Sequence, residues 1–234
     1  MKTPLFVVTG SSRGIGRAIT NRLLAEGYGV LGFARDHTHG PCHPNYHGHN
    51  IDLSDLNAVP SKLSPIAKRH PDVSGIISNA GSGTFGCLEQ LSAKQIRSSI
   101  DLNLTSHLLV IAAFLPGLKK RGEGDIVIMG SESALQGGKQ GTVYCAAKFG
   151  LRGFAQSLRL ECAPSGVRVG IIHPGMVRTG FFDDLSFCPG NESHQAIEPD
   201  DVAEAVWSMV SMRRGTVLGE LVMSPQTKVI QKQP

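Results

Sequence analysis

A tyrosine and a lysine stand four positions apart in the run Tyr144-Cys-Ala-Ala-Lys148, and Ser131 precedes the tyrosine by thirteen positions. If this run is helical, both side chains share one helix face, so a phenol and an ammonium group point the same way. A free tyrosine, with a pKa of about 10, is a poor acid or base at neutral pH, and a nearby cation favours its ionised form. We therefore expect the pair to pass a proton to or from a substrate oxygen. An isolated match of this kind more often marks a solvated helix face, so its weight depends on the rest of the chain.

A glycine-rich turn follows the first apolar segment. Residues 5–9 are apolar and β-branched, which is typical of a buried strand, and the run Gly10-Ser-Ser-Arg-Gly-Ile-Gly16 then leads into a helical pattern that ends at Gly27. Such a turn brings backbone N–H groups and a helix N-terminus close to a pyrophosphate. The spacing differs from the G-x-G-x-x-G fingerprint, and a tight turn without a ligand is the alternative. The position directly after the first strand favours a dinucleotide site.

Length and composition indicate one compact domain. The chain has 234 residues, of which 41% are hydrophobic and 18% charged, and a net charge of +4. Lysine and arginine are scattered except at 119–121 and 213–214, which we interpret as helix C-terminal charges and not as a nucleic-acid surface. We find no apolar run long enough to span a bilayer and no signal peptide. Five widely spaced cysteines favour a reducing compartment. We expect a cytoplasmic protein without nucleic-acid or membrane partners.

Strand and helix patterns alternate along the chain. This alternation implies a parallel sheet with right-handed crossovers and helices on both faces. Strands are expected at 5–9, 30–34, 46–51, 75–78, 125–129, 167–172 and 218–223, and helices at 17–27, 92–102, 104–119, 142–162 and 199–212.

Three further turns follow the expected strands at the edge where such sheets bind ligands. One is the small-residue run at 78–83, which a flat ring could approach, the second begins at Gly130, and the third covers 173–179. All three would lie along the same edge as the first glycine turn. Ser131 would then reach a substrate oxygen held by Tyr144.

In order and spacing these segments resemble the short-chain dehydrogenase/reductase family over nearly the whole chain. The resemblance implies a single doubly wound, Rossmann-type α/β domain over residues 1–234, with a central parallel sheet and helices on both faces. It also implies NAD(P)-dependent hydride transfer to or from a carbonyl carbon. The matching positions are Thr9-Gly10-x3-Gly14-Ile15-Gly16, Asp52-Leu53, Asn79-Ala80-Gly81, Asn103, Ser131, Tyr144-x3-Lys148 and Pro174-Gly175-x-Val177-x-Thr179.

The resemblance implies a role for each catalytic position. Tyr144 would be the general acid in reduction and the base in oxidation, while Lys148 would lower its pKa and bind the nicotinamide ribose. Ser131 would hold and polarise the substrate oxygen. Ser133 is the alternative serine, which the thirteen-residue spacing to Tyr144 disfavours. Asn103 would hold a water molecule that links Lys148 to solvent.

The resemblance also implies a set of cofactor contacts. Asp52 would contact the adenine, Asn79 would stabilise the central strand beside the cofactor, and Thr179 would bond the nicotinamide carboxamide. The full set of expected cofactor-binding residues is Gly10, Ser12, Arg13, Gly14, Ile15, Gly16, Arg35, Asp52, Leu53, Asn79, Ala80, Gly81, Tyr144, Lys148, Pro174, Gly175, Val177 and Thr179.

The end of the second strand predicts which dinucleotide is used. Enzymes of this architecture that use NAD carry a carboxylate there, whereas this chain has Ala34 followed by Arg35. Arg13 supplies a second guanidinium, and two such groups would clamp a 2′-phosphate. Asp36 would take the acidic role if the strand ended two residues later, and both arginines could instead be solvated loop charges. We predict a preference for NADPH over NADH.

The chain departs from the family pattern in two places. Ser78 replaces the first residue of the usual Asn-Asn-Ala-Gly run. Between the second and third strands, residues 36–49 are rich in His, Pro and Gly, so we expect a loop where most members have a helix. Its histidines and cysteine suggest a metal site, but no ligand pair has the spacing of a zinc finger, and we expect no metal.

Two other segments carry expectations. Residues 176–198 are long and aromatic and follow the strand at 167–172, where a lid over the substrate would lie. The helix at 104–119 is apolar on all sides, which predicts a homotetramer or homodimer.

Two functions remain open from the sequence. One is an NADP(H)-dependent oxidoreductase acting on a small carbonyl or alcohol; the other is a non-catalytic dinucleotide-binding regulatory or structural protein. The intact set of Asn103, Ser131, Tyr144 and Lys148 favours the enzyme. Residues 220–227 resemble members that act on 3-hydroxy acids and serine-like substrates, but the lid differs and the sequence does not name the substrate.

Overall fold

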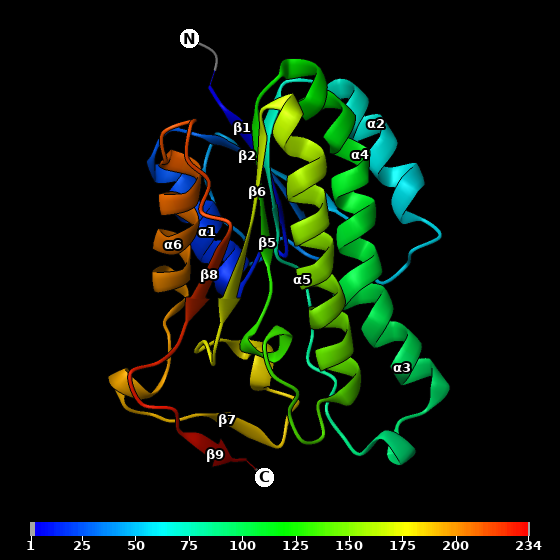
Figure 1. Cartoon of the computed structure of the whole chain (residues 1–234), viewed down its shortest axis with the longest axis vertical. Helices are drawn as coiled ribbons and strands as arrows, with labels where there is room; N and C mark the ends of the chain where they lie inside the picture. Colours follow the sequence, from blue (N-terminus) through cyan, green and yellow to red (C-terminus); the bar gives the residue numbers. More distant parts are fainter. Residues whose placement is uncertain (1–2, 234) are drawn as a thin grey trace.

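The protein is built around one parallel sheet between two layers of helices in the computed structural model, which describes residues 3–233 (Figure 1). Every neighbouring pair of strands in this sheet is parallel. The chain begins near the middle of the sheet and winds outwards in both directions, which confirms the doubly wound α/β fold. The strand order is β3 (Tyr46–Asn50), β2 (Gly29–Ala34), β1 (Leu5–Thr9), β4 (Val73–Ser78), β5 (Gly124–Met129), β6 (Val167–Pro174) and β8 (Glu220–Met223).

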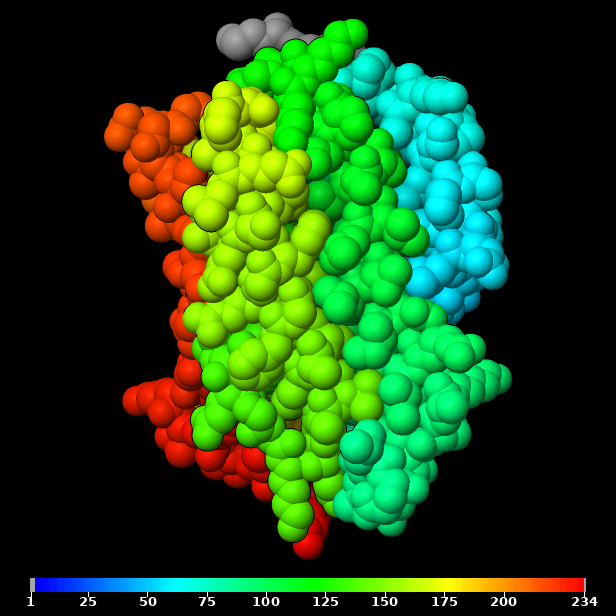
Figure 2. Space-filling view, turned by 45° about the vertical axis from the view of Figure 1, so that its right-hand side comes forward, coloured from blue at the N-terminus to red at the C-terminus, as the bar shows by residue number. Residues whose placement is uncertain are grey.

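Helices cover both faces of the sheet. The first face carries α1 (Gly14–Ala25) and α6 (Pro199–Ser211), and the second carries α2 (Val59–Arg69), α4 (Ser106–Arg121) and α5 (Thr142–Cys162) (Figure 1). Figure 2 shows α5, α4 and α2 side by side across the second face. The remaining helices are α3 (Ala93–Ile100), a π-helical turn at Asp101–Thr105, and 3₁₀ turns at Leu88–Gln90, Glu132–Ala134, Ala163–Ser165, Gly180–Phe182 and Ser193–Gln195.

The sheet separates two apolar cores. Strands β2, β4, β5 and β6 are buried at every residue, as expected of strands covered on both faces. Because side chains alternate along a strand, Val7 belongs to the core under α4 and α5, whereas Phe6 and Val8 belong to the core under α1 and α6. Each fully buried side chain of this size contributes roughly 1.5–3 kcal/mol. The packed cores hold the carboxyl ends of the strands in place.

A continuous helical stretch, Ala93–Arg121, replaces the two helices predicted at 92–102 and 104–119. The π-helical turn joins α3 to α4 without a break. By length and composition this stretch could cross a membrane, which corrects the expectation that the chain has no such run. Core helices meet the same criterion, and α4 packs Val110, Ile111, Phe114 and Leu118 into the core under it.

Helix α2 and the small ribbon formed by β7 (Phe187–Pro189) and β9 (Ile230–Lys232) were not expected from the sequence. Two prolines obscure the α2 pattern, but the first lies in the opening turn, where its missing N–H costs nothing. Strands β7 and β9 pair antiparallel outside the main sheet over three residues each, too few for a periodic pattern.

The segment between β2 and β3 contains no helix within the described residues, as predicted. The bounds of the other elements shift by a few residues. Strand β6 continues to Pro174, two residues beyond the prediction, and β8 begins at Glu220 instead of 218. The extension of β6 carries His173 into the sheet, directly beside β8.

Candidate active site

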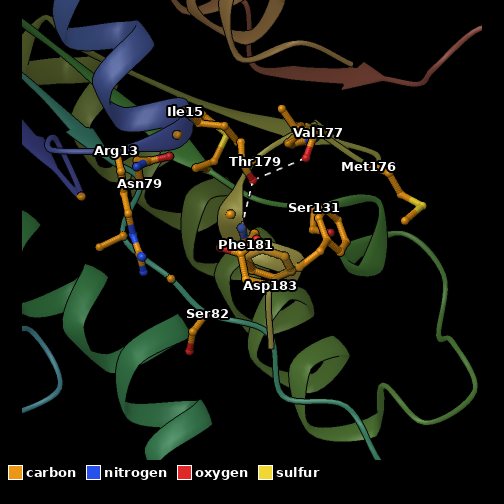
Figure 3. Close-up of a pocket in the computed structure, with 18 of the residues that line it drawn as sticks. Arg13, Ile15, Asn79, Ser82, Ser131, Met176, Val177, Thr179, Phe181 and Asp183 are labelled. Carbon is orange, nitrogen blue, oxygen red and sulfur yellow. Dashed lines mark hydrogen bonds between the residues drawn. The ribbon is translucent and has the colours of Figure 1, made fainter. Parts of the chain in front are cut away.

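An open cleft of about 2160 Å³ lies along the carboxyl edge of the sheet. Its walls include the glycine loop (residues 10–16) and the turns after β4, β5 and β6, so the segments expected to meet at this edge do so. Figure 3 shows Arg13 and Asn79 on one side of the cleft and Ser131 beside Phe181 on the other. The expected cofactor-binding residues all line the cleft, except that Gly16 lies beneath the glycine loop.

The glycine loop presents an uncapped helix N-terminus to the cleft. No side chain caps α1, and no acidic residue lies in its first turn, so its first N–H groups and its dipole are available to an anion. Gly14 has a φ of 52°, which residues with a Cβ rarely adopt. A Cβ at Gly16 would overlap the carbonyl oxygen of Gly10. This loop fits the pyrophosphate of a dinucleotide.

The ends of β1 and β4 are held together by Asn79. Its amide nitrogen donates to the Thr9 carbonyl at 2.9 Å, and its backbone N–H donates to the Thr9 hydroxyl at 2.8 Å. The N–H of Ala80 donates to the same hydroxyl at 2.9 Å. These bonds fix the spacing between the glycine loop and the turn after β4, so Asn79 stabilises the central strands as expected.

A buried histidine accompanies the unusual serine at the end of β4. Nδ1 of His107 lies 2.8 Å from the Ser78 hydroxyl, and Nε2 lies 2.8 Å from the Ala80 carbonyl. Burial, with the charge of Lys148 nearby, lowers the pKa of His107 to about 3, so the ring is neutral. A neutral ring donates from Nε2 to the carbonyl and accepts the serine proton at Nδ1. No pattern in the sequence indicates this pair.

Tyr144, Lys148 and Ser131 meet on the floor of the cleft. Helix α5 carries the tyrosine and the lysine on its buried face, where they are only 7% and 3% exposed. Ser131, in the turn after β5, has a hydroxyl that acts to lower the pKa of the Tyr144 phenol, and it also caps the following turn by accepting from Ser133 N–H at 3.1 Å. Nζ of Lys148 donates to the Met129 carbonyl at 3.0 Å and lies 5.7 Å from the centre of the tyrosine ring. The serine that meets Tyr144 is thus Ser131, while Ser133 only lines the cleft.

Burial is the main cause of the pKa shifts of Tyr144 and Lys148. It raises the pKa of Tyr144 to about 12, and the hydrogen bond from Ser131 opposes the shift only in part. Burial also lowers the pKa of Lys148 to about 8. The expectation that Lys148 lowers the pKa of Tyr144 is therefore wrong for the protein alone, because the ammonium group faces a backbone carbonyl instead of the phenol. Tyr144 is a protonated phenol at neutral pH, ready to donate.

Asn103 lies in the π-helical turn, fully buried behind the cleft. Its side-chain oxygen accepts from Ser82 N–H at 3.1 Å, and its nitrogen donates to the Ser82 and Ser99 carbonyls at 3.0 Å. The asparagine thus ties the helix to the turn after β4. A π turn widens the helix and disturbs its regular backbone bonding, a feature frequent at functional sites.

A second buried histidine contacts Ser131 from behind. Nδ1 of His173 lies 3.3 Å from the Ser131 N–H and 3.1 Å from its carbonyl oxygen. Nε2 lies 3.0 Å from a Glu220 oxygen, at an angle that makes no regular hydrogen bond, and Arg152 lies 2.7 Å from the same oxygen. Burial lowers the pKa of His173. His173 therefore positions Ser131. The sequence indicated the turn that contains His173 but not this role of the histidine.

Residues 176–198, expected to form a lid and called the lid segment below, are held by backbone pairing where the segment begins and ends and again at its tip. Val177 pairs with Ile197 in a β-bridge, and Ile197 N–H donates to Met176 O at 2.9 Å. Thr179 donates to Val177 O at 3.4 Å and accepts from Phe181 N–H at 3.3 Å (Figure 3). At the tip, β7 pairs with β9, and Nε2 of Gln233 donates to the carbonyls of Phe182, Leu185 and Phe187 at 2.7, 3.1 and 3.2 Å.

The far end of the cleft carries two exposed arginines. Strand β2 ends at Ala34 as expected, and Arg35 and Arg13 both line the cleft beside it. The Asp36 carboxylate accepts from the Thr38 N–H at 2.9 Å and from its hydroxyl at 2.6 Å. These bonds hold the pKa of Asp36 below its usual range and fold its side chain onto its own loop. This end offers two guanidinium groups to an anion.

The loop between β2 and β3 is held by a chain of polar side chains. The Tyr46 hydroxyl lies 2.9 Å from the Ser11 hydroxyl and 2.7 Å from Nδ1 of His37, whose Nε2 lies 3.1 Å from the His49 carbonyl. The chain connects the edge strand to the underside of the glycine loop. Among residues 3–233, no group of three or more His, Cys, Asp or Glu side chains is placed to hold a metal ion.

Comparison with known proteins gives a consistent result. A family model described as short chain dehydrogenase matches residues 5–186. The 3-oxoacyl-[acyl-carrier-protein] reductase FabG of Buchnera aphidicola is 28% identical over 227 residues, which is 91% of each chain. The human 17-beta-hydroxysteroid dehydrogenase type 1 is 31% identical over 203 residues, covering 81% of this chain and 61% of that protein.

A solved structure agrees with this chain over nearly its whole length. The alcohol dehydrogenase of the archaeon Thermococcus sibiricus, in complex with 5-hydroxy-NADP, superimposes with a TM-score of 0.86 at 28% identity. The match covers 97% of this chain and 99% of that one.

Proposed function

The chain belongs to the short-chain dehydrogenase/reductase family, and on that premise we propose that it is an NADP(H)-dependent oxidoreductase for small carbonyl and alcohol substrates. One observation carries the proposal. A protonated phenol, a hydroxyl and a buried ammonium group, from Tyr144, Ser131 and Lys148, meet on the floor of a cleft whose other end offers an uncapped helix N-terminus.

The proposed chemistry is carbonyl reduction and its reverse. The bound nicotinamide dinucleotide supplies a hydride to the carbonyl carbon in reduction and accepts it in oxidation. Tyr144 gives its proton to the carbonyl oxygen, so that C=O becomes CH–OH and the phenol becomes phenolate. Ser131 donates a hydrogen bond to the same oxygen as negative charge develops there. His173 holds the backbone of Ser131 in position for that bond.

Lys148 and Asn103 would restore the proton of Tyr144. The ammonium group of Lys148, with a pKa of about 8, exchanges protons near neutral pH. In the proposal Asn103 belongs to the path from Lys148 to solvent, through the helical backbone at the π turn. The lysine also contributes to holding the nicotinamide ribose.

The residues that would hold the dinucleotide form three groups along the cleft. The glycine loop takes the pyrophosphate, Asp52 and Leu53 border the adenine, and the turn after β6 borders the nicotinamide. Arg13 and Arg35 favour NADP(H), because a 2′-phosphate matches two guanidinium groups and no strand-end carboxylate opposes it. The NADP analogue in the Thermococcus sibiricus structure supports this preference.

A non-catalytic cofactor-binding protein of the same fold is the alternative. The buried Tyr144 phenol and the Ser131 hydroxyl favour the enzyme, because a protein without turnover has no use for a proton donor on the floor of the cleft. We further propose a single domain in which residues 176–198 act as the lid, a homotetramer or homodimer, and a cytoplasmic location without nucleic-acid partners.

The test is turnover with a panel of neutral and acidic carbonyl compounds. Purified protein is mixed with NADPH and a panel of ketones, aldehydes and 3-oxo acids, and with NADP⁺ and the matching alcohols, and absorbance at the nicotinamide band is followed. We expect reduction of at least one neutral carbonyl with kcat near the usual range of about 1–10³ s⁻¹. Tight NADPH binding without turnover of any carbonyl or alcohol would support the non-catalytic alternative.

A further inference from the structure

Two phenylalanines contact the Tyr144 ring, and two more pack against those. The ring centre of Phe85 lies 5.2 Å from that of Tyr144, and the centre of Phe181 lies 6.1 Å from it. Phe187 touches Phe85 at 5.0 Å, and Phe182 touches both Phe181 at 5.1 Å and Phe187 at 5.8 Å. We call these five rings the aromatic chamber. All five line the cleft.

These four phenylalanines lie outside the two main cores. None belongs to either of the two cores that hold the helices on the sheet. They come from three separate segments: the turn after β4, the 3₁₀ turn of the lid segment, and β7. In Figure 3 the Phe181 ring lies beside Ser131, within the cleft. Their shared location, next to the proton donor, is therefore a property of the binding site.

The aromatic chamber contains little that could pair with a charged substrate. Among the described residues that line this part of the cleft, the buried cation is Lys148, which belongs to the catalytic group. Lys228 is exposed and bound to Glu132 at 2.8 Å, and Lys139 and Lys232 are exposed at the rim. The Arg178 guanidinium is occupied by Glu198 at 2.9 Å and the Gly190 carbonyl at 3.0 Å.

A carboxylate next to the reacting carbonyl would therefore lose its hydration without gaining a buried cation of its own. Transfer of an unpaired charge into such surroundings is strongly unfavourable. Short 3-oxo acids and serine-like substrates, whose carboxylate lies two or three bonds from the reacting carbon, do not fit this site. The tail at 220–227, which resembles members acting on such acids, does not supply the missing cation: its charged residue, Glu220, is acidic and pairs with Arg152.

From this geometry we propose that the physiological substrate class is uncharged ketones or aldehydes, and the matching alcohols, that carry an aromatic ring near the reacting carbon. Phe85 and Phe181 would select that ring by edge and offset contacts. The inference rests on the proposed function, since it places the carbonyl at Tyr144. An aromatic pair gains roughly 2- to 12-fold in equilibrium terms beyond its buried area.

The test uses three ketones that differ in one property at a time. 4-Phenyl-2-butanone and 4-cyclohexyl-2-butanone have the same carbon skeleton, and in neither is the ring conjugated to the carbonyl. 4-Oxopentanoate replaces the ring by a carboxylate, three bonds from the reacting carbon. We expect kcat/KM with NADPH to be at least about fivefold higher for the phenyl than for the cyclohexyl ketone. For the carboxylate we expect a value at least about 100-fold below that of the phenyl ketone.

Substitutions of single phenylalanines test which rings cause the preference for the phenyl ketone. Phe85→Leu and Phe181→Leu keep an apolar wall but remove the rings, and each is expected to reduce the phenyl-to-cyclohexyl ratio by at least about twofold. Phe149→Leu is the matched control, because Phe149 is 44% exposed on α5 and does not line the cleft. Its ratio should equal that of the unmodified protein. Equal use of both ketones, or a preference for the carboxylate, would overturn the inference.

Ligand binding separates a failure of this inference from a failure of the proposed function. NADPH binding is followed by fluorescence, and binding of the phenyl and cyclohexyl ketones by saturation-transfer NMR on the same sample. If no ketone is reduced but the phenyl ketone binds preferentially and Phe181→Leu abolishes the preference, the aromatic site stands and the oxidoreductase activity fails. If a ketone is reduced while neither binding nor turnover distinguishes the rings, the activity stands and the aromatic site is refuted.

Discussion

The two ends of the cleft are built by different parts of the fold. The cofactor end consists of turns between buried strands, and side chains such as Asn79 bind one strand end to the next. The substrate end consists of the lid segment, the far part of the turn after β4 that carries Phe85, and strand β9, all outside the main sheet. There the fastening is by a two-stranded ribbon and by backbone carbonyls that accept from Gln233.

Because of this difference, catalysis and cofactor binding depend on one part of the fold and substrate recognition on another. The cofactor end and the catalytic residues inherit the stability of two apolar cores, so their geometry is held to the precision that proton transfer needs. The substrate end lies in surface segments, which tolerate changes of sequence without disturbing the sheet. Mutations at the substrate end should thus change substrate preference without loss of cofactor binding. Mutations at the cofactor end should lower cofactor affinity without loss of substrate binding.

Replacement of Tyr144 by Phe should separate the two ends most sharply. Without the phenol hydroxyl there is no proton donor, and we expect kcat to fall about 10³-fold or more while NADPH affinity stays within about threefold. Steady-state absorbance and fluorescence titration measure the two quantities. Tyr28→Phe, in a ring cluster with Phe6 and Trp207 away from the cleft, is the control and should keep full activity. A Tyr144→Phe variant with near-normal kcat would refute the mechanism.

The reverse separation should follow from Gly16→Ala. Its Cβ would overlap the Gly10 carbonyl and press on the Asn79 amide, so the glycine loop must shift. We expect NADPH affinity to fall about 100-fold, equivalent to ~2.7 kcal/mol, while binding of the phenyl ketone to the aromatic chamber persists. Gly153→Ala is the control, since a Cβ there meets no atom within 4 Å, and it should leave affinity unchanged. Similar affinities in the two variants would show that the loop tolerates the added methyl.

Lys148→Met tests a buried charge that lies between the two ends. The pKa of Lys148 falls from 10.5 to about 8 on folding, so between pH 8 and 10.5 the unfolded chain binds more protons and stability rises with pH. Below pH 8 the lysine is charged in the folded protein, so burying its charge destabilises the fold by the full amount. At pH 7 we expect the inactive methionine variant to be more stable by about 2 kcal/mol, or roughly 4–8 °C in Tm.

The same comparison at pH 9.5 supplies the control. Most of the cost of the charged lysine is relieved there, and the raised pKa of Tyr144 has not yet begun to act, since its effect starts near pH 10. We therefore expect the Tm difference between the two proteins to shrink by at least about half. A methionine variant that is less stable at pH 7, or a difference that does not change with pH, would contradict the assignment of Lys148 as a destabilising cation.

The choice of dinucleotide sharpens the description of the cofactor end. We expect kcat/KM for NADPH to exceed that for NADH at least tenfold, which requires ~1.4 kcal/mol. Combining Ala34→Asp with Arg35→Ala supplies the missing carboxylate and removes one guanidinium, and should reverse the preference. KM for 4-phenyl-2-butanone, measured with saturating cofactor, should not change. Equal use of both cofactors by the unmodified protein, or a preference for NADH, would disprove the role given to Arg13 and Arg35.

Gln233→Ala should give the smallest effect, confined to the substrate end. The change removes three hydrogen bonds to the lid segment, from Nε2 to the carbonyls of Phe182, Leu185 and Phe187. These carbonyls are partly open to water, so we expect KM for the ketone to rise only about threefold, with NADPH affinity unchanged. Gln226→Ala, at an exposed position of the same terminal segment, is the control. A loss of NADPH affinity would mean that the two ends are coupled.

The sequence predicted the cofactor end of the cleft better than the substrate end. The glycine loop, the strand ends and the meeting of Tyr144 with Ser131 follow from local patterns, because strand and helix periodicity places them at one edge. The pairing of Ser78 with His107 and the contact of His173 with Ser131 join residues 29 and 42 positions apart. Such contacts depend on packing, which single-sequence patterns do not record.

The protonation states were harder to foresee than the positions. The spacing of Tyr144 and Lys148 suggested a cation acting on a phenol, but both groups are buried, and burial acts on them in opposite directions. The sequence indicated an aromatic segment at 176–198, but not that its rings would meet Phe85 and Tyr144. Phe181 and Phe182 lie in one 3₁₀ turn, Phe187 lies in a three-residue strand and Phe85 lies in an irregular turn, where no periodicity reveals which side chains face the same space.

The order of strands in the sheet also determines when the cleft can form during folding. Strand β1 pairs on one side with β2 and on the other with β4, so that Leu5 and Val73 are partners across 68 positions of chain. Closing such long loops before any pairing is gained makes parallel sheets slow to fold. The glycine loop at the end of β1 lacks its neighbour on one side until β4 pairs with β1 and Asn79 bonds to Thr9. Competence to bind a dinucleotide should thus appear as a late event in refolding, well after the helices form.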